Sequence, residues 1–369
     1  MYGEKVKDDK MTSKIYHSNG KPFLPVYYIF SLNGETRFSA RKSFLKGECM
    51  ANIREIARMA GVSVTTVSRV LNDHPYVSEE KKAAVQKVME EVNYQRNINA
   101  VHLSKGKTYL IGVVIPFSNS PYFAFLVEGI ANEAVKNNYK LVLFQTNYEL
   151  NREIEALNML KQKQIDALII CSRISDWEVI SEYKVYGPII LCEEVEDKIV
   201  SATYIDHYKS FSIALNYLHQ KGHNRIGYCI GRRSGTNSEM REAAYKNFLL
   251  ENGQPFLQEY IFYDSYRFED GEGIVSRLKE MISPPTALLV TSDQVAAGII
   301  TCARERGILV PNKLAIMGFD NQPIAKIMNI TTLEIPLVEV GEKLFIQAMQ
   351  YPSIFQEEIK VKLIERLTV

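Results

Sequence analysis

Polar and aromatic side chains recur just after short apolar runs between residues 108 and 330. The candidate ligand contacts among them are Tyr122, Phe123, Glu193, Arg241, Tyr266, Ser292, Asp293 and Asp320. An arginine beside carboxylates can hold the hydroxyl groups of a polyol through charge-assisted hydrogen bonds. Aromatic rings suit the apolar face of a pyranose. These side chains therefore indicate a site for a small polyhydroxylated ligand.

Some of these residues also fit a purely structural role. Tyr122 and Phe123 could simply begin a helix with aromatic core residues. Asp293 suits a helix N-cap, where it would bind free backbone amides, as well as it suits a ligand contact. Asp320 lies in the stretch GFDN and could be a turn residue, although its position after a strand favours binding. The residue types alone leave both roles open.

Motifs for catalysis or metal binding are absent from the sequence. The six histidines form no HExxH or other ligand spacing, and neither GxSxG nor a phosphate-binding P-loop occurs. No GxGxxG follows a first strand, which argues against a dinucleotide enzyme. We therefore expect no enzyme, no metal site and no cofactor.

Alternating strand and helix patterns begin at Tyr109 and would position the candidate contacts. The predicted strands are YLIGVVIP, KLVLFQ, DALIIC, PIILCE, TYIDH, RIGYCIG, YIFY, TALLVT and LAIMGFD. The predicted helices are 122–137, 152–162, 177–183, 211–220, 239–250, 274–281 and 294–306. Two sets of about five strands imply two parallel doubly wound sheets. Ligands bind at the carboxyl ends of such strands, which is where the candidate contacts fall.

Residues 52–94 carry the pattern of three short helices. Asn52 and Glu55 suit a capping box, Gly61 interrupts the first helix, and Ser63 can cap the second. The inward-facing residues are predicted to be Ile56, Ala57, Ala60, Val67, Val70, Leu71, Val85, Val88, Met89 and Val92. The first two helices form a helix-turn-helix unit, whose second helix typically enters the major groove of DNA. A plain helical bundle is the alternative.

Length and composition are those of a multidomain globular protein. The chain has 369 residues, a formal net charge of +1 and 46% hydrophobic residues, which suits two or three domains. The five cysteines, Cys49, Cys171, Cys192, Cys229 and Cys302, lack metal-ligand spacing, as in reduced cytoplasmic proteins. The start MYGEKVKDDKM has no apolar core of a secretory signal, and no run approaches a membrane span.

Three stretches make the chain similar to the lac/galactose repressor family of bacterial transcription regulators. They are IREIARMAGVSVTTVSRVLN, VSEEKKAAVQKVMEEVNY and NINAVHL, and the resemblance continues to about Leu367. It implies an α plus α/β fold with a helix-turn-helix DNA-binding headpiece over 50–96, a hinge helix and linker over 97–107, and a two-lobed periplasmic-binding-protein-like domain over 108–369. The implied DNA contacts are Ser63, Val64, Thr65, Thr66, Ser68, Arg69, Asn72, Asn97, Ala100 and Leu103.

The hinge departs from the family pattern at two positions. Arg96 replaces the usual proline, and Val101 replaces a frequent arginine of the minor groove. The resemblance implies that Leu103 from each subunit wedges between base pairs and kinks the duplex. A core position at the domain junction is the structural alternative for Leu103.

The resemblance also implies a function and partners. A homodimer would bind palindromic double-stranded operator DNA and repress sugar-utilisation genes, under the control of a small sugar or sugar-phosphate effector between the lobes. Arg241 would bridge the lobes to the effector, Glu193 and Asp320 would accept its hydroxyl groups, and Tyr266 and Ser292 would line the opposite wall. A dimer is expected because the chain ends without a leucine-heptad tail. No membrane is involved.

Two other functions remain open. The first is a global carbon regulator whose corepressor is a phosphorylated phosphocarrier protein. The second is a free sugar-binding protein, which residues 50–107 argue against.

Residues 1–49 lie outside the resemblance. Lys46, Gly47 and Glu48 can be encoded by AAA GGA GAA, which contains a ribosome-binding sequence just upstream of a start codon at Met50. We therefore expect that translation starts at Met50 and that residues 1–49 are translated leader. A weakly ordered extension with a hairpin at Asn33-Gly34 is the alternative.

Overall fold

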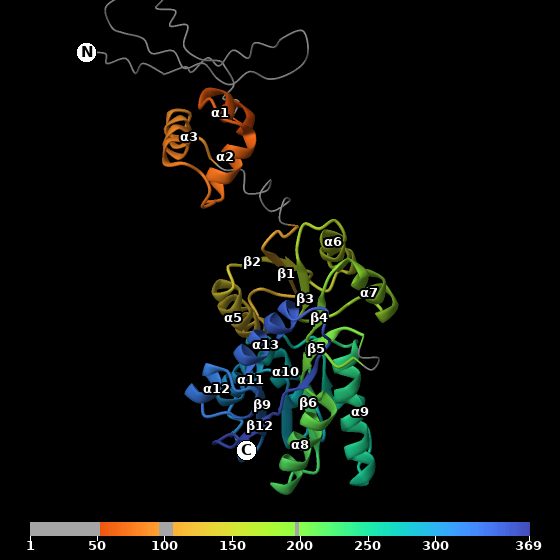
Figure 1. Ribbon diagram of the computed structural model, residues 1–369. Coiled ribbons are helices and arrows are strands. Elements are labelled where there is room, and N and C mark those ends of the chain that lie inside the picture. Colours follow the sequence, from red (N-terminus) through yellow and green to blue (C-terminus); the bar gives the residue numbers. More distant parts are fainter. Residues whose placement is uncertain (1–51, 96–105, 196–198) are drawn as a thin grey trace, which may run out of the picture. The chain divides into compact units, whose positions relative to one another are not determined.

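The computed structural model describes residues 52–95, 106–195 and 199–369, drawn as coloured ribbon in Figure 1. The chain divides into two compact units, Met1–Arg96 and Asn97–Val369. The predictions for residues 1–49, for the departures at Arg96 and Val101, and for the hinge contacts Asn97, Ala100 and Leu103 lie outside the described residues.

Capped helices build the described part of the first unit. Helix α1 (Ile53–Met59) begins with the predicted capping box, in which Asn52 Oδ1 accepts the N–H of Glu55 at 3.0 Å and the Glu55 carboxylate accepts the N–H of Asn52 at 3.0 Å. Helix α2 (Val64–Leu71) is capped by Ser63, whose Oγ accepts the N–H of Thr66 at 3.1 Å. Both predicted caps are therefore confirmed.

A third helix, α3 (Glu79–Glu91), closes the core of this unit. The buried residues are Ile56, Ala57, Val67, Val85 and Val88. Val70, Leu71 and Met89 pack against them while partly exposed. The inward faces predicted for the three helices thus meet, and the exposed face of α2 remains free of core packing.

Six strands form the sheet of what we call the first lobe of the second unit. Their order is β11-β5-β4-β3-β1-β2, and all neighbours are parallel. The elements up to the first crossing are β1 (Leu110–Ile115), α5 (Pro121–Lys136), β2 (Lys140–Gln145), α6 (Leu150–Lys161), β3 (Ala167–Ile170), α7 (Trp177–Tyr183), η1 (Lys184–Tyr186), β4 (Ile189–Leu191) and β5 (Ser201–Tyr204).

The second lobe contains the other six-stranded sheet, in the order β12-β10-β9-β8-β6-β7. Its neighbours are parallel except for the edge pair β10 and β12. The elements are α8 (His207–Gln220), β6 (Ile226–Cys229), α9 (Thr236–Glu251), η2 (Gln258–Tyr260), β7 (Ile261–Phe262), α10 (Asp270–Glu280), β8 (Ala287–Val290), α11 (Asp293–Glu305), β9 (Ala315–Asp320), α12 (Pro323–Ile327) and β10 (Thr331–Glu334).

The chain then returns to each lobe once more. Helix α13 (Leu337–Met349) and strand β11 (Gln356–Glu358) join the first lobe, and β12 (Lys362–Ile364) joins the second. The two predicted parallel sheets are confirmed. The sequence predicted no element after Asp320, so α13, β11 and β12 were not expected. Several helices also begin earlier than predicted, such as α8, which begins at His207 instead of 211.

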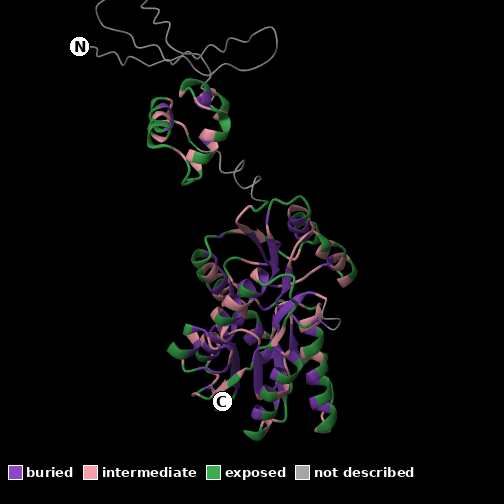
Figure 2. Cartoon of the chain, in the orientation of Figure 1, coloured by how far each residue is buried: buried purple, intermediate pink, exposed green. Residues whose placement is uncertain are grey.

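Burial follows the central strands of both sheets. All residues of β3, β8 and β9 are buried, whereas the edge strand β2 contains only exposed and half-buried residues. Figure 2 shows the buried strands in purple and the outward helix faces in green. Among the described cysteines, Cys171, Cys192, Cys229 and Cys302 are free, as predicted. No helix in the described ranges is both long enough and apolar enough to cross a membrane.

Two glycines allow α5 and α13 to approach within backbone contact in the first lobe. A Cβ added to Gly129 would lie 1.9 Å from the carbonyl oxygen of Val338, and one added to Gly341 would lie 2.1 Å from the carbonyl oxygen of Leu126. Both clashes involve backbone atoms, which side-chain rotation cannot relieve. This helix pair, visible side by side in Figure 1, therefore requires the absence of a side chain at both positions.

We expect Gly341→Ala to destabilise the second unit, because the added methyl group must push α5 and α13 apart. Overpacking of this kind typically costs about 1–3 kcal/mol. Urea unfolding would measure the loss. The matched control is Gly273→Ala in α10, where an added Cβ meets nothing within 4 Å. The control should leave stability unchanged or raise it by up to ~1 kcal/mol through helix propensity. Equal effects of the two substitutions would contradict the close-packing explanation.

Candidate ligand pocket

A cavity of about 150 Å³ lies between the two lobes, at the carboxyl ends of their parallel strands. Seven of the eight predicted contacts line it: Tyr122, Phe123, Glu193, Arg241, Tyr266, Ser292 and Asp320. They come from elements of both sheets, so the strand-end rule located the cavity from sequence. Asp293 is the exception.

Arg241, on α9, is one of two arginines that line the pocket, together with Arg232. One terminal nitrogen lies 3.2 Å from Nδ1 of His207, and Nε is buried without a hydrogen-bond partner among the described residues. Burial lowers the pKa of Arg241, and the neighbouring Tyr122 and Asp320 oppose this lowering. The guanidinium therefore has hydrogen-bonding capacity that the protein leaves unused.

His207 begins α8 and was missed by the sequence analysis. Burial and then the charge of Arg241 hold the pKa of His207 well below its ordinary value, so the ring is neutral. Because arginine can only donate, Nδ1 of His207 must accept and Nε2 carries the proton. The pair thus aligns the arginine and places a ring N–H at the lobe junction.

Asp320 ends β9, and its carboxylate charge opposes the lowering of the pKa of Arg241 by burial. Its Oδ2 accepts a hydrogen bond from Nε2 of Gln322 at 2.9 Å. Burial raises the pKa of Asp320 to about 7, while the Gln322 hydrogen bond and the Arg241 charge oppose the rise. Its φ of 97° and that of Asn321, 54°, lie in the left-handed region. The side chain therefore lines the pocket from a sharply turned backbone.

Asp293 does not line the pocket, which corrects the expectation of a ligand contact there. The side chain is 0% exposed, its Oδ1 accepts from Thr332 Oγ1 at 2.7 Å, and its Oδ2 accepts the N–H of Gln322 at 2.7 Å. The helix N-cap is Ser292, so the capping alternative for Asp293 was wrong as well. The carboxylate instead holds the turn that follows Asp320.

Aromatic rings enclose the cavity. Tyr122 and Phe123 lie in the first turn of helix α5, edge to face with centroids 5.0 Å apart, and both line the cavity. Burial raises the pKa of Tyr122 well above its ordinary value, which keeps the hydroxyl protonated. Tyr266 packs against Phe117 of the first lobe at 5.5 Å between centroids. The rings therefore come from both lobes.

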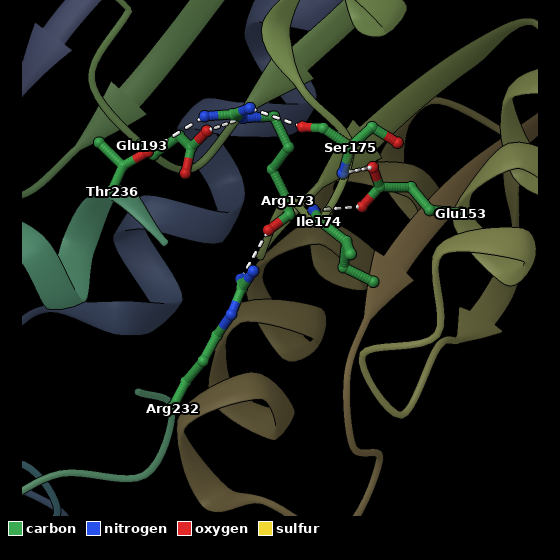
Figure 3. A network of polar contacts seen from close by, with 7 residues as sticks. All are labelled: Glu153, Arg173, Ile174, Ser175, Glu193, Arg232 and Thr236. Atoms are coloured by element: carbon green, nitrogen blue, oxygen red, sulfur yellow. Dashed lines mark hydrogen bonds and ion pairs between the residues drawn. The ribbon is translucent and has the colours of Figure 1, made fainter. Parts of the chain in front are cut away.

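Two arginines that the sequence analysis missed link the lobes at the pocket edge. Arg173 forms an ion pair with Glu193 and donates to Thr236 Oγ1 at 3.0 Å, as Figure 3 shows. Arg232 donates to the backbone oxygen of Arg173 at 2.7 Å. Arg232 directly follows the predicted strand RIGYCIG, and Arg173 follows DALIIC by one residue. The strand-end rule that found the other contacts would have found both.

The exposed face of α2 presents the predicted headpiece contacts. Val64 is 45% exposed, Thr65 and Arg69 are exposed, and Thr66 and Ser68 are half-buried. Ser63 and Thr66 hydroxyls lie 2.9 Å apart at the helix start. At the helix end, Nδ2 of Asn72 donates to the backbone oxygen of Ser68 at 2.8 Å. These residues form one polar face with a single apolar side chain, Val64.

Comparisons with known proteins place both units in one family. A model described as "Bacterial regulatory proteins, lacI family" matches residues 52–97, and one described as "Periplasmic binding proteins and sugar binding domain of LacI family" matches residues 108–367. The uncharacterized HTH-type transcriptional regulator YkvZ of Bacillus subtilis (strain 168) is 43% identical over 323 residues, which cover 87% of this chain and 100% of the relative.

Solved structures agree with this assignment at the level of the fold. The lac repressor dimer bound to operator and the anti-inducer ONPF has a TM-score of 0.72 and 22% identity, and the match covers 86% of this chain and 98% of that chain. A LacI family transcriptional regulator from Lactobacillus casei with bound glucose has a TM-score of 0.65 and 23% identity, with coverage of 70% and 99%.

A helix-turn-helix headpiece and a two-lobed ligand-binding unit define a bacterial transcriptional regulator. The chain belongs to the LacI family of such regulators, as the sequence resemblance predicted. The comparisons do not favour the alternative of a global regulator with a phosphocarrier corepressor. Catabolite control protein A of Priestia megaterium is 32% identical, against 43% for YkvZ.

We expect the buried carboxyls of Asp320 and Asp293 to contribute stability that is lost as the pH rises from about 4 to 8. The lowered pKa of His207 contributes the opposite slope below its ordinary pKa, so the carboxyl contribution is read from the difference between the wild type and a carboxyl variant. Burial raises the pKa of Asp320 to about 7 and, with the charge of Asp320, that of Asp293 to about 8. The folded state therefore holds protons that the unfolded chain releases near pH 4, and their loss at higher pH is destabilising. Each carboxyl contributes a slope of at most about 1.4 kcal/mol per pH unit.

Replacing Asp320 by Asn should flatten this dependence, because it removes one titrating group and the charge that raises the pKa of the other. The amide oxygen can still accept the hydrogen bond of Gln322. Urea unfolding at pH 5, 6, 7 and 8 measures both slopes. If the free energy of unfolding of Asp320→Asn depends on pH as steeply as that of the wild type, the raised pKa of Asp320 is contradicted.

Proposed function

We propose that the protein is a cytoplasmic homodimeric repressor of sugar-utilisation genes. It binds palindromic operator DNA through α2, and a small sugar-like effector in the pocket between the lobes controls that binding. It catalyses no reaction. The observation that carries the proposal is the pocket itself, which combines Arg241, carboxylates and aromatic rings at the strand ends of both lobes.

The size and chemistry of the pocket favour a compact polyol. Pockets for drug-sized ligands occupy roughly 300–1,000 Å³, and this cavity of about 150 Å³ is smaller. Arg241 offers donors to hydroxyl oxygens, Asp320 and Glu193 offer acceptors, and the rings offer apolar faces. Structures of the Lactobacillus casei regulator hold glucose in one case and sucrose in another. A neutral sugar or sugar phosphate of this kind is the effector we propose.

The exposed face of α2 supports recognition of operator DNA. Val64 and Thr65 would lie at base edges, with Val64 against a thymine methyl group, and Arg69 would bind a guanine or a phosphate. The remaining proposed DNA contacts are Ser63, Thr66, Ser68, Asn72, Asn97, Ala100 and Leu103. The proposed domain boundaries are 50–96 for the headpiece, 97–107 for the hinge and linker, and 108–369 for the effector-binding and dimerisation domain.

The two sites are coupled by linkage. An effector that favours one state of lobe closure changes operator affinity only through its differential affinity for the two closure states. Both lobes contribute to the pocket, so closure alters the effector contacts directly.

The test is selection of binding sites from random duplex DNA by the full chain, with and without D-glucose and sucrose. Enrichment of a palindrome whose affinity changes with one sugar supports the whole proposal. A palindrome that responds to neither sugar confines the support to DNA binding and calls for a wider panel. Enrichment of no sequence would overturn the proposal.

We expect Arg241→Ala to remove the response to the effector and to leave effector-free operator affinity unchanged. Hydrogen bonds to a charged group contribute about 1.5–3 kcal/mol, so effector affinity should fall about 10- to 100-fold. Calorimetry with the responsive sugar and a gel shift on the selected palindrome measure the two quantities. Lys246→Gln, on the exposed face of the same helix, is the matched control. If Arg241→Ala loses effector-free operator affinity while Lys246→Gln keeps it, the proposal that Arg241 acts only in effector binding is contradicted.

A further inference from the structure

We propose that Arg173 is a positioning residue that couples the pocket carboxylate Glu193 to closure of the two lobes. The inference rests on the proposed function, because it assigns a mechanism to the same pocket. Arg173 lies between β3 and α7 of the first lobe, and it reaches the first residue of α9 in the second.

The three nitrogens of the Arg173 guanidinium have three different partners. Nε pairs with Oε1 of Glu193, one terminal nitrogen donates to the backbone oxygen of Ser175 at 2.6 Å, and the other donates to Thr236 Oγ1 at 3.0 Å. The Arg173 and Glu193 side chains are only 19% and 10% exposed. A guanidinium is planar and rigid, so its three contacts are geometrically linked.

A buried carboxylate fixes the base from which Arg173 extends. Glu153, on α6, is 0% exposed, and its two oxygens accept the backbone N–H groups of Ile174 and Ser175, each at 2.8 Å. A carboxylate is buried at acceptable cost only when it is hydrogen-bonded. Figure 3 shows Glu153 on one side of this loop and the Arg173 guanidinium on the other. The loop is therefore anchored within the first lobe before it contacts the second.

A second arginine, Arg232, extends from the second lobe to the first. Arg232 donates to the backbone oxygen of Arg173 at 2.7 Å, and its guanidinium lies 4.8 Å from the ring centroid of Tyr148 in the first lobe. Opening the lobes would break these two contacts and the Arg173 to Thr236 hydrogen bond together. The ion pair between Arg173 and Glu193 would survive, because both residues belong to the first lobe and follow the neighbouring strands β3 and β4.

Glu193 therefore has two functions in one carboxylate. It lines the pocket, where it can accept an effector hydroxyl, and it holds the guanidinium that bridges to Thr236. Thr236 begins α9, the helix that also carries Arg241. The contacts from Glu193 through Arg173 to Thr236 join the lobes without a ligand. A ligand bound to Glu193 and Arg241 would contact both the first residue of this chain of contacts and the helix at its other end. This arrangement makes Arg173 the residue through which effector contact changes the closure equilibrium.

The only tryptophan of the chain provides a reporter for this link. Trp177 lies two residues after Ser175, begins α7 and is half-buried. The experiment records Trp177 emission and the radius of gyration by small-angle scattering, on the full chain without any sugar. The variants are Arg173→Gln, Arg173→Lys and Thr236→Val. Glu155→Gln, on the exposed side of α6, is the matched control for a change of charge near the loop.

We expect Thr236→Val to shift the Trp177 emission, although the substitution is in the opposite lobe. It should also enlarge the radius of gyration, because loss of one charge-assisted hydrogen bond reduces the closure constant about 10-fold. Arg173→Gln should have a larger effect. Arg173→Lys should retain the ion pair with Glu193 but lose the simultaneous hydrogen bonds to Ser175 and Thr236, so we expect an intermediate result. The control should match the wild type.

Titration with D-glucose and sucrose then separates this inference from the proposed function. A sugar that closes wild-type protein should bind Arg173→Lys more weakly than Glu155→Gln. Unchanged emission and unchanged radius in both Thr236→Val and Arg173→Gln would overturn the coupling, whether or not a sugar binds. Thr236→Val leaves Arg173 and Glu193 intact, so it decides the question even if Arg173→Gln fails to fold. If neither sugar binds any variant, the effector proposal fails while the sugar-free measurements still test the link.

Discussion

The guanidinium of Arg241 is enclosed between two lobes with fewer acceptors than its donors require. A buried charge is stable only where hydrogen bonds and opposite charges replace water. Here the hydrogen-bond partner is the neutral ring of His207, Nε is unpaired among the described residues, and Asp320 is itself shifted toward its protonated form. The second unit therefore holds a donor group in a cavity between the lobes, where a ligand with hydroxyl oxygens can satisfy it. The rest of the fold positions this group.

Parallel sheets supply that position at low structural cost. Each strand of β3, β4, β6 and β9 ends at the same edge of its sheet, so residues far apart in sequence converge on the cavity. The turn after β9 needs more support, because Asp320 and Asn321 both have left-handed φ angles. Asp293 supplies it by accepting the N–H of Gln322 from the adjacent helix α11. A residue outside the pocket thus determines the orientation of one inside it.

The sequence predicted the two sheets and most of the pocket because both follow from local patterns. Apolar runs mark the buried strands, and side chains after those runs mark the ligand edge. The same rule failed for Asp293, because sequence position does not tell whether a carboxylate faces the cavity or a neighbouring backbone N–H. The rule also marks Arg173 and Arg232, but it does not predict their partners in the opposite lobe, which lie 63 and 59 residues away. The crossings after Asp320 were missed because short edge strands such as β11 and β12 depend on long-range pairing.

The cross-lobe contacts bear on how much an effector can change. A ligand shifts a two-state equilibrium only by the ratio of its affinities for the two states. If the lobes closed only around a ligand, the protein would contribute nothing to closure and the effector would have to supply all of it. Arg173 and Arg232 already join the lobes from opposite sides. In the closure that we propose, these contacts contribute part of the free energy that joins the lobes, so the proposed effector would supply only the remainder.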